Sequence, residues 1–375
     1  NPDIDPFCGH NGVRGYCPPD NFEGAHCTLY KGDGKGHFRD VSKEVGLLDC
    51  ALGKSFGIGV ADLNNDGWLD IIITNDTWAN FVFINHEGKH FEEVGVPSGI
   101  ALAENGKARA GMGIDVGDWR NNGKQSVVIG NFTSEGLSLF EPEAGVSFAD
   151  HAQTEGITPA SLLNVTFATF FLDVDFDGWL DIFLANGHVY PEVEQSTADE
   201  RYLQPNQLFH NEHNGTFREV TKESGAPFTL LHTARGVAFG DYDNDGKIDI
   251  LVNNNDGVPV LLHNTAPQKH HFALLQLVGT KSNRDAIGTR VWLKSGATTQ
   301  LRDRKSGGSY LSSSDPRLHF GLGESTTFQE IEVHWTSGLH QTLKGNWKSD
   351  TLYELREGDN TLHSAKFPTS RKGSP

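Results

Sequence analysis

The sequence is poor in positive charge and in long apolar segments, and each shortage excludes a class of protein. Against 49 Asp and Glu stand only 31 Lys and Arg, so the formal net charge is −18. This acidity argues against nucleic acid and anionic membranes as partners. No apolar run reaches the roughly eighteen residues that a membrane-spanning helix needs. Nucleophile elbows, phosphate-binding loops and zinc-protease helices are also absent, so the sequence favours a protein that is not an enzyme.

Cysteine is missing from the chain after its first fifty residues. The four cysteines are Cys8, Cys17, Cys27 and Cys50. We predict that the first pairs with the second and the third with the fourth in two local disulfides, which would place the protein in a secreted or periplasmic compartment. Zinc binding is the alternative because His10 and His26 lie nearby, although the short Cys-x-x-Cys spacing of structural zinc sites is absent.

An acidic phrase of nine residues occurs three times. Oxygen-bearing side chains occupy positions one, three, five and nine, and a glycine at position six permits a sharp turn. The copies are Asp62, Asn64, Asp66 and Asp70; Asp173, Asp175, Asp177 and Asp181; and Asp241, Asp243, Asp245 and Asp249. Hard cations such as Ca²⁺ prefer several oxygen ligands, so we predict about three calcium sites. Position twelve is Ile73, Leu184 or Val252 and not the Glu of an EF-hand, which places these loops between strands.

A fourth copy of the phrase has lost most of its acidic groups. It reads Asp118, Arg120, Asn122, Gly123 and Ser126 at the equivalent positions. A guanidinium at a ligand position brings positive charge to the site. We therefore expect this loop to keep the turn and to bind no calcium.

The four loops recur at intervals of 56, 55 and 68 residues, and each is flanked by short apolar strands. Between them lie hairpins centred on phenylalanine, such as Phe83 with Phe91 and Phe209 with Phe217. A period near sixty that holds four short strands is typical of a propeller blade. The apolar strands after the loops, such as 71–73, are expected to be buried on both faces. The fold class is therefore all-β.

The acidic-loop repeats end near residue 266. Strands of alternating apolar and polar residues follow, and they predict a C-terminal antiparallel β-sandwich. The predicted parts are a disulfide-stapled loop (1–26), propeller blades (27–265), the sandwich (266–358) and a polar tail (359–375).

The aspartate loop with its Phe56–Gly57 lead-in resembles the FG-GAP or VCBS repeats of integrin-like propellers. The segments 279–288 (GTKSNRDAIG), 306–311 (SGGSYL) and 318–323 (LHFGLG) resemble the ASPIC/UnbV domain. The resemblance implies calcium and a ring that commonly has seven blades. Since four acidic half-repeats are present, we expect additional blades in sequence that precedes Asn1.

A ligand pocket is a weaker expectation. His188 and Tyr190 follow an apolar strand in the segment NGHVYP, and Arg109 in RAGMG has a similar place in the preceding repeat. The alternative is that these residues only hold long loops between blades. We expect an extracellular calcium-binding propeller that acts as a protein-interaction or scaffolding module. A carbohydrate-binding lectin, an enzyme with a site at the propeller mouth near His188, and a subunit of a larger assembly are alternatives. The partner is an unknown protein or glycan.

Overall fold

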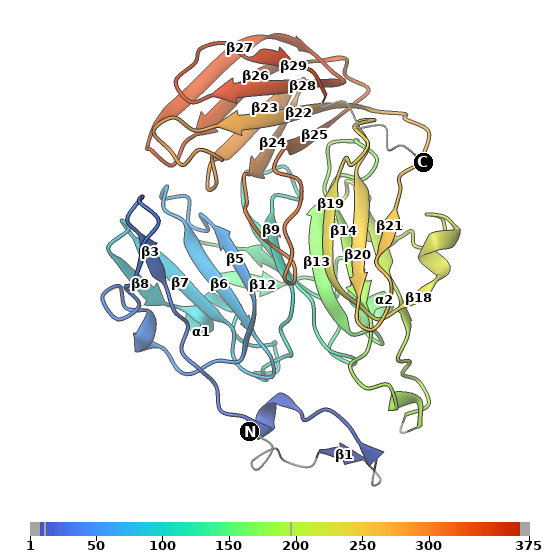
Figure 1. Ribbon diagram of the computed structural model, residues 1–375. Coiled ribbons are helices and arrows are strands. Elements are labelled where there is room, and N and C mark those ends of the chain that lie inside the picture. Colours follow the sequence, from blue (N-terminus) through green and yellow to red (C-terminus); the bar gives the residue numbers. More distant parts are fainter. Residues whose placement is uncertain (1–7, 11–12, 196, 368–375) are drawn as a thin grey trace.

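The computed structural model describes residues 8–10, 13–195 and 197–367 (Figure 1). The fold is all-β as predicted, with 41% strand and 6% helix. Helices are limited to short turns such as α1 (Gly95–Ser98) and α2 (Thr158–Ser161). The β-rich composition is explained by the many short apolar runs that end in Gly, Asn and Asp turns.

Four antiparallel sheets stand next to one another as blades. The first contains β5 (Ser55–Ala61), β6 (Asp70–Asn75), β7 (Phe81–His86) and β8 (His90–Glu93). The second contains β9 (Ile114–Gly117), β10 (Ser126–Ile129), β11 (Ser138–Pro142) and β12 (Phe148–Asp150). The third contains β13 (Thr166–Leu172), β14 (Asp181–Asn186), β16 (Gln207–Asn211) and β17 (Phe217–Glu219). The fourth has three strands, β19 (Ala234–Gly240), β20 (Asp249–Asn254) and β21 (Val260–Leu262).

Three two-stranded sheets lie outside the blades. They are β1 (Gly9–His10) with β2 (Val13–Arg14), β3 (Tyr30–Gly32) with β4 (Phe38–Asp40), and β15 (Gln204–Pro205) with β18 (Leu231–His232). The first strands of successive blades contact one another, β5 with β9, β9 with β13 and β13 with β19. The blades therefore follow one another around a common axis, with their first strands innermost.

Burial depends on where a blade lies in the series. Every residue of β13 and β14, in the third blade, is buried, because neighbouring blades cover both faces of their sheet. In the first blade Ile58 is 57% exposed, and in the fourth blade Leu251 is 48% exposed. The expectation that the apolar strands are buried on both faces therefore holds for the third blade but is wrong for β20, which lacks a further sheet on one side.

The C-terminal sandwich contains two four-stranded sheets. One has the order β25 (Leu318–Gly323), β22 (His271–Val278), β28 (Thr351–Arg356) and β29 (His363–Ala365). The other has the order β24 (Thr298–Asp303), β23 (Arg290–Ser295), β26 (Thr327–His334) and β27 (His340–Lys348). The sheets are antiparallel except that β22 and β28 pair in parallel. The prediction of a purely antiparallel sandwich is wrong at this pair, because strands of the opposite sheet separate β22 from β28 along the chain.

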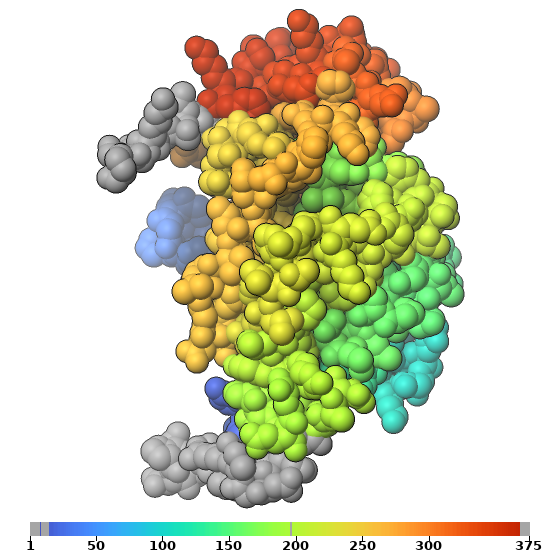
Figure 2. Space-filling view, turned by 90° about the vertical axis from the view of Figure 1, so that its right-hand side faces the viewer, coloured from blue at the N-terminus to red at the C-terminus, as the bar shows by residue number. Residues whose placement is uncertain are grey.

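The sandwich lies on the upper ends of the blades (Figure 1). A side view shows the segment after β21 rising along the edge of the blades into the sandwich (Figure 2). The connection between β24 and β25, residues 304–317, leaves the sandwich and descends between the innermost strands; we call it the axial loop. Ser309 N donates to Ile114 O at 2.7 Å, and Asp315 N donates to Phe239 O at 2.9 Å. The axial loop therefore occupies the space around which the blades are arranged.

The N-terminal segment contains one of the two predicted disulfides. Cys8 and Cys17 are joined, as predicted. Cys27 and Cys50 are free, so the predicted second disulfide is wrong in this structure. Cys50 Sγ donates to Leu47 O at 3.2 Å, and Cys27 Sγ lies 3.5 Å from Ser55 Oγ. Each thiol thus has a local polar neighbour of its own.

No described helix is long and apolar enough to cross a bilayer.

Candidate calcium sites

Each acidic loop joins the first strand of a blade to the second. In loop 62–70 the amide groups of Asp66 and Gly67 donate to the two carboxylate oxygens of Asp62, both at 3.0 Å. Gly67 has a φ of 90°, a left-handed conformation that glycine adopts without strain. Gly178 and Gly246 repeat this turn in the other two loops, with φ values of 94° and 91°. The sequence phrase therefore specifies a common turn that points its carboxylates inward.

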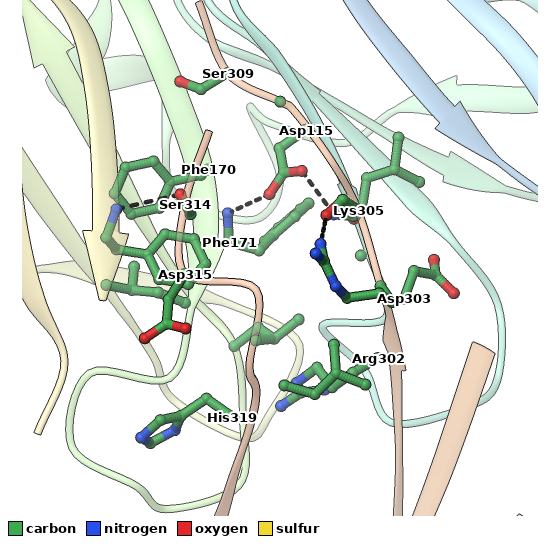
Figure 3. Close-up of a pocket in the computed structure, with 18 of the residues that line it drawn as sticks. Asp115, Phe170, Phe171, Arg302, Asp303, Lys305, Ser309, Ser314, Asp315 and His319 are labelled. Carbon is green, nitrogen blue, oxygen red and sulfur yellow. Dashed lines mark hydrogen bonds and ion pairs between the residues drawn. The ribbon is translucent and has the colours of Figure 1, made fainter. Parts of the chain in front are cut away.

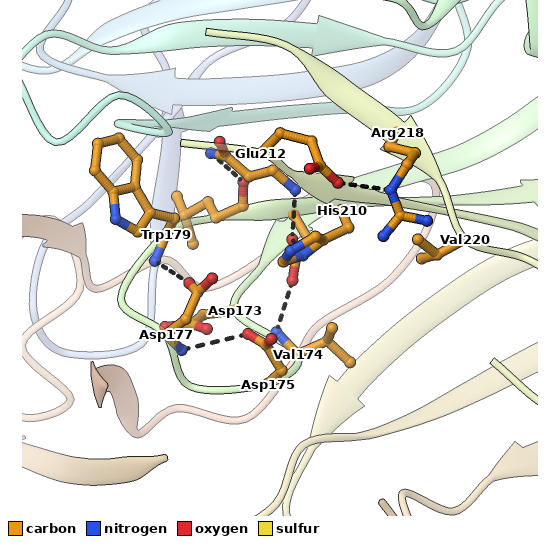
Figure 4. A network of polar contacts seen from close by, with 12 residues as sticks. Asp173, Val174, Asp175, Asp177, Trp179, His210, Glu212, Arg218 and Val220 are labelled. Atoms are coloured by element: carbon orange, nitrogen blue, oxygen red, sulfur yellow. Dashed lines mark hydrogen bonds and ion pairs between the residues drawn. The ribbon is translucent and has the colours of Figure 1, made fainter. Parts of the chain in front are cut away.

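Three carboxylates converge in each of the acidic loops of the third and fourth blades. One oxygen from each of the first three aspartates of a loop lies within 4.8 Å of the other two. These sets are Asp173, Asp175 and Asp177, and Asp241, Asp243 and Asp245. Figure 4 shows the first set gathered beside Trp179 and His210. Loop 62–70 differs, because Arg290 of the sandwich donates to Asp62 Oδ2 at 2.8 Å.

The loops concentrate negative charge where water is largely excluded. Burial, followed by repulsion from Asp177 and Asp181, raises the pKa of Asp173 well above its usual range. Burial also raises the pKa of Asp181 to about 6 and that of Asp70 to about 6. Asp173 Oδ1 is buried without a hydrogen-bond partner. A buried oxygen without a partner inside an all-oxygen donor set is what a hard divalent cation would satisfy, so these residues fit Ca²⁺.

A second layer of residues, which the sequence analysis did not identify, holds the ninth position of each phrase. The backbone N–H groups of Asn85, Asn211 and Asn264 donate to the Oδ1 atoms of Asp70, Asp181 and Asp249, at 2.8, 2.9 and 2.8 Å. Nδ1 of His210 and of His263 lies 3.1 and 2.9 Å from the same oxygen in the third and fourth blades. The available signal was an asparagine at or just beyond the end of the third strand of each of these blades. These groups fix the orientation of the carboxylate at the ninth position.

The degenerate loop keeps the turn, as predicted. Asn122 N and Gly123 N donate to the two oxygens of Asp118 at 3.0 and 2.7 Å. Arg120 turns away from the loop and donates to Glu141 and Glu155 at 3.0 and 2.9 Å. An ion-pair network therefore connects this loop to the outer part of its blade.

Arginines of the sandwich and of the axial loop reach the face that carries the acidic loops. Arg317 donates to Asn244 Oδ1 and to Asp241 O, both at 2.9 Å, and Arg290 donates to Asn65 Oδ1 at 3.0 Å. Between the loops and the axial loop lies a cavity of about 120 Å³ (Figure 3). Lys305 Nζ lies 2.7 Å from Asp115 Oδ1 on its wall. Apolar side chains line much of the cavity, but polar groups such as these also face it, and it is large enough for ordered water.

The predicted ligand residues lie at the opposite ends of the blades and only partly come together. His188 Nδ1 accepts a hydrogen bond from Tyr190 N at 3.0 Å, and the two rings lie 5.5 Å apart. Burial lowers the pKa of His188 to about 4, so this side chain is neutral near pH 7. Arg109 pairs instead with Asp150 Oδ2 at 2.6 Å. Its guanidinium therefore ties two parts of the second blade together.

Comparisons with known proteins agree with this architecture. The FG-GAP-like repeat family matches residues 22–73, 62–129 and 173–252, and the ASPIC and UnbV family matches residues 279–362. Cartilage acidic protein 1 of Mus musculus is 26% identical over 317 residues, which are 80% of this chain and 44% of that protein. The chain thus spans less than half of that relative's length. Integrin alpha-3 of Mus musculus is 30% identical over 105 residues, which are 24% of this chain and 10% of that protein.

Among solved structures, that of an Agrocybe aegerita lectin, described as recognising non-reducing terminal N-acetylglucosamine, covers 90% of this chain and 73% of its own. Its sequence is 16% identical and its TM-score is 0.37, a value too low to carry an argument about function. The family matches lie on the blades and on the sandwich described above. The chain belongs to the family of proteins that combine FG-GAP-like repeats with an ASPIC and UnbV domain.

Proposed function

We propose that the chain is an exported, calcium-stabilised interaction module. The observation that carries this proposal is the convergence of three aspartates within 4.8 Å in each of two loops, with a buried, partnerless oxygen on Asp173. Loop 62–70 has the same turn and is proposed as the third site. Its donor set includes Asn64, and Asp62 shares its charge with Arg290. Calcium would neutralise the clustered carboxylates and fix the loops on which the sandwich rests.

Export is supported by the Cys8–Cys17 disulfide, which persists in an oxidising compartment. An interaction role is supported by the rigidity of the arrangement, since blades held at one end by the sandwich present their other loops as a fixed surface.

The axial loop fills the space between the innermost strands, and this weighs against an enzyme with a substrate channel along the axis. Trp68 is 43% exposed, but within the part of the chain that the structure describes no other feature specific to sugar binding accompanies it.

The proposal is tested with purified, calcium-loaded protein immobilised on a biosensor surface. A panel of purified extracellular matrix proteins and a glycan array are applied with calcium and again with EGTA. Saturable binding to a matrix protein that is lost with EGTA supports the proposal. Binding to glycans alone, accompanied by quenching of tryptophan fluorescence, would replace it with the lectin. Binding that EGTA leaves unchanged would show that the interaction does not require bound calcium.

A further inference from the structure

At the end of the blades opposite the acidic loops, one residue of the fourth blade departs from a pattern that the other three blades share. Six residues before the first aspartate of each loop stand Phe56, Met112, Phe167 and Arg235. In the first and third blades this residue packs against Tyr310 of the axial loop, with ring centroids 5.8 and 5.3 Å apart. Met112 belongs to the same apolar cluster. The fourth blade places a guanidinium where the other three place an apolar side chain.

The charge of Arg235 has no acidic partner among the described residues. Its terminal nitrogens donate to three backbone carbonyls, those of Gly187 at 3.1 Å, Ala234 at 2.8 Å and His188 at 3.1 Å. In contrast, Arg109, Arg120 and Arg290 each contact a carboxylate. Burying a cation without a counter-ion costs free energy. The chain has 49 acidic residues, yet none of the described ones offsets this cost at Arg235.

The surroundings of Arg235 are aromatic and uncharged. The guanidinium carbon lies 3.9 Å from the ring centre of Phe167, a cation–π contact. Burial lowers the pKa of Arg235, and the ionisable groups that affect it are the hydroxyls of Tyr202, Tyr310 and Tyr16. Tyr16, on the disulfide-bonded N-terminal segment, is 65% exposed and marks the side that is open to solvent.

Arg235 also keeps a donor for a ligand. A guanidinium has five N–H groups. No described residue accepts a hydrogen bond from Nε of Arg235. Buried polar atoms without a partner do not include this Nε, so it is accessible to solvent. Glu200 Oε2 lies 3.3 Å from His188 Nε2, and Glu200 forms no ion pair with Arg235.

We propose that Arg235, with Phe167, Tyr202 and Tyr16 around it, binds the carboxylate of a small organic acid at the end of the propeller that faces away from the sandwich. The carboxylate accepts from the free N–H groups of the guanidinium, and the body of the acid lies against the aromatic rings. The site lies at the other end of β19 from loop 241–249, about 20 Å along the strand. It therefore does not depend on the metal.

A structural brace is the competing explanation, because Arg235 also holds the backbone at Gly187 and His188. Isothermal titration of calcium-loaded wild-type protein separates the two. The probes are glucuronate and N-acetylaspartate, which distinguish an acidic sugar from an acidic amino acid, and glucose is the uncharged control. We expect one of the acids to bind with a Kd of about 1 mM or below and glucose not to bind. The R235Q variant should lose at least about tenfold in affinity.

The matched control is R39Q, which removes an exposed guanidinium paired with Glu44 and should bind like the wild type. If R235Q does not fold, the wild-type protein is modified with phenylglyoxal and analysed by mass spectrometry. Saturating acid should then slow modification of Arg235 and leave Arg39 unchanged. The proposal is overturned if neither acid binds or protects the wild type, if glucose binds equally well, or if R235Q binds as tightly as the wild type.

Discussion

Removing calcium should destabilise the protein by an amount comparable to the whole stability of an ordinary domain. An ion that binds only the folded state at a free concentration of 100 times its Kd contributes about 2.7 kcal/mol. Three independently filled loops would therefore contribute about 8 kcal/mol, against typical unfolding free energies of about 5–15 kcal/mol. The structural reason is that burial disfavours the charged form of these carboxylates and raises the pKa of Asp70 and of Asp181 to about 6, with repulsion from Asp66 and Asp62 added at Asp70.

The assay is differential scanning calorimetry of metal-loaded protein with calcium and with excess EGTA. We expect the melting temperature to fall by about 10 °C or more on chelation. The D181N variant should show a smaller EGTA effect because one site is weakened. The D118N variant, altered in the degenerate loop, should be less stable but should keep the full EGTA effect. An unchanged melting temperature after EGTA, in protein first shown to contain metal, would refute the reasoning.

Three further substitutions test other parts of the account. R120M should lower the unfolding free energy by about 3 kcal/mol with and without EGTA, because Glu141 and Glu155 lose their counter-ion; equal stability in urea unfolding would contradict this. E357Q should cost about 2 kcal/mol because the Glu357 carboxylate accepts hydrogen bonds from the Ser337 hydroxyl and from the amides of residues 280–282, which together hold its pKa at about 2. This contribution is present above the ordinary pKa of 4.5 and is lost as pH falls toward about 2, so E357Q should flatten the acid limb of the stability profile. G246A should cost more than about 1 kcal/mol in the same urea assay, since its φ is 91° and the new Cβ would lie 2.2 Å from Phe272; wild-type stability would show that this turn relaxes freely.

Local spacing was sufficient to predict the parts of the fold that depend on neighbouring residues. The acidic phrase gave the position of the loops and of the glycine turn at Gly246, since both follow from residues within nine positions. The apolar strands on either side of each loop gave the blades. The Cys8–Cys17 bridge likewise closes a short local segment.

Contacts between distant segments could not be predicted in this way. Arg290 reaches Asp62 across 228 positions, and nothing in the local sequence distinguishes it from a surface arginine. The axial loop is rich in Gly and Ser and resembles an ordinary turn, but it contacts strands of all four blades. The parallel pair of β22 and β28 escaped prediction because alternation within a strand does not specify the direction of its neighbour.

The departure from the repeat at Arg235 is visible in the sequence, but the sequence alone does not show what the equivalent residues contact. Only the structure shows that the preceding blades place Phe56, Met112 and Phe167 around Tyr310. A substitution that breaks internal symmetry is therefore informative in a repeat protein, because the other copies indicate what packing alone would require.

The most direct test of the central claim is to locate calcium by anomalous diffraction from crystals of the protein grown in calcium. The account predicts three peaks, within loops 62–70, 173–181 and 241–249, each surrounded by the aspartate oxygens, and no peak in loop 118–126. Loops without anomalous density at saturating calcium, or equal density in all four loops, would contradict it.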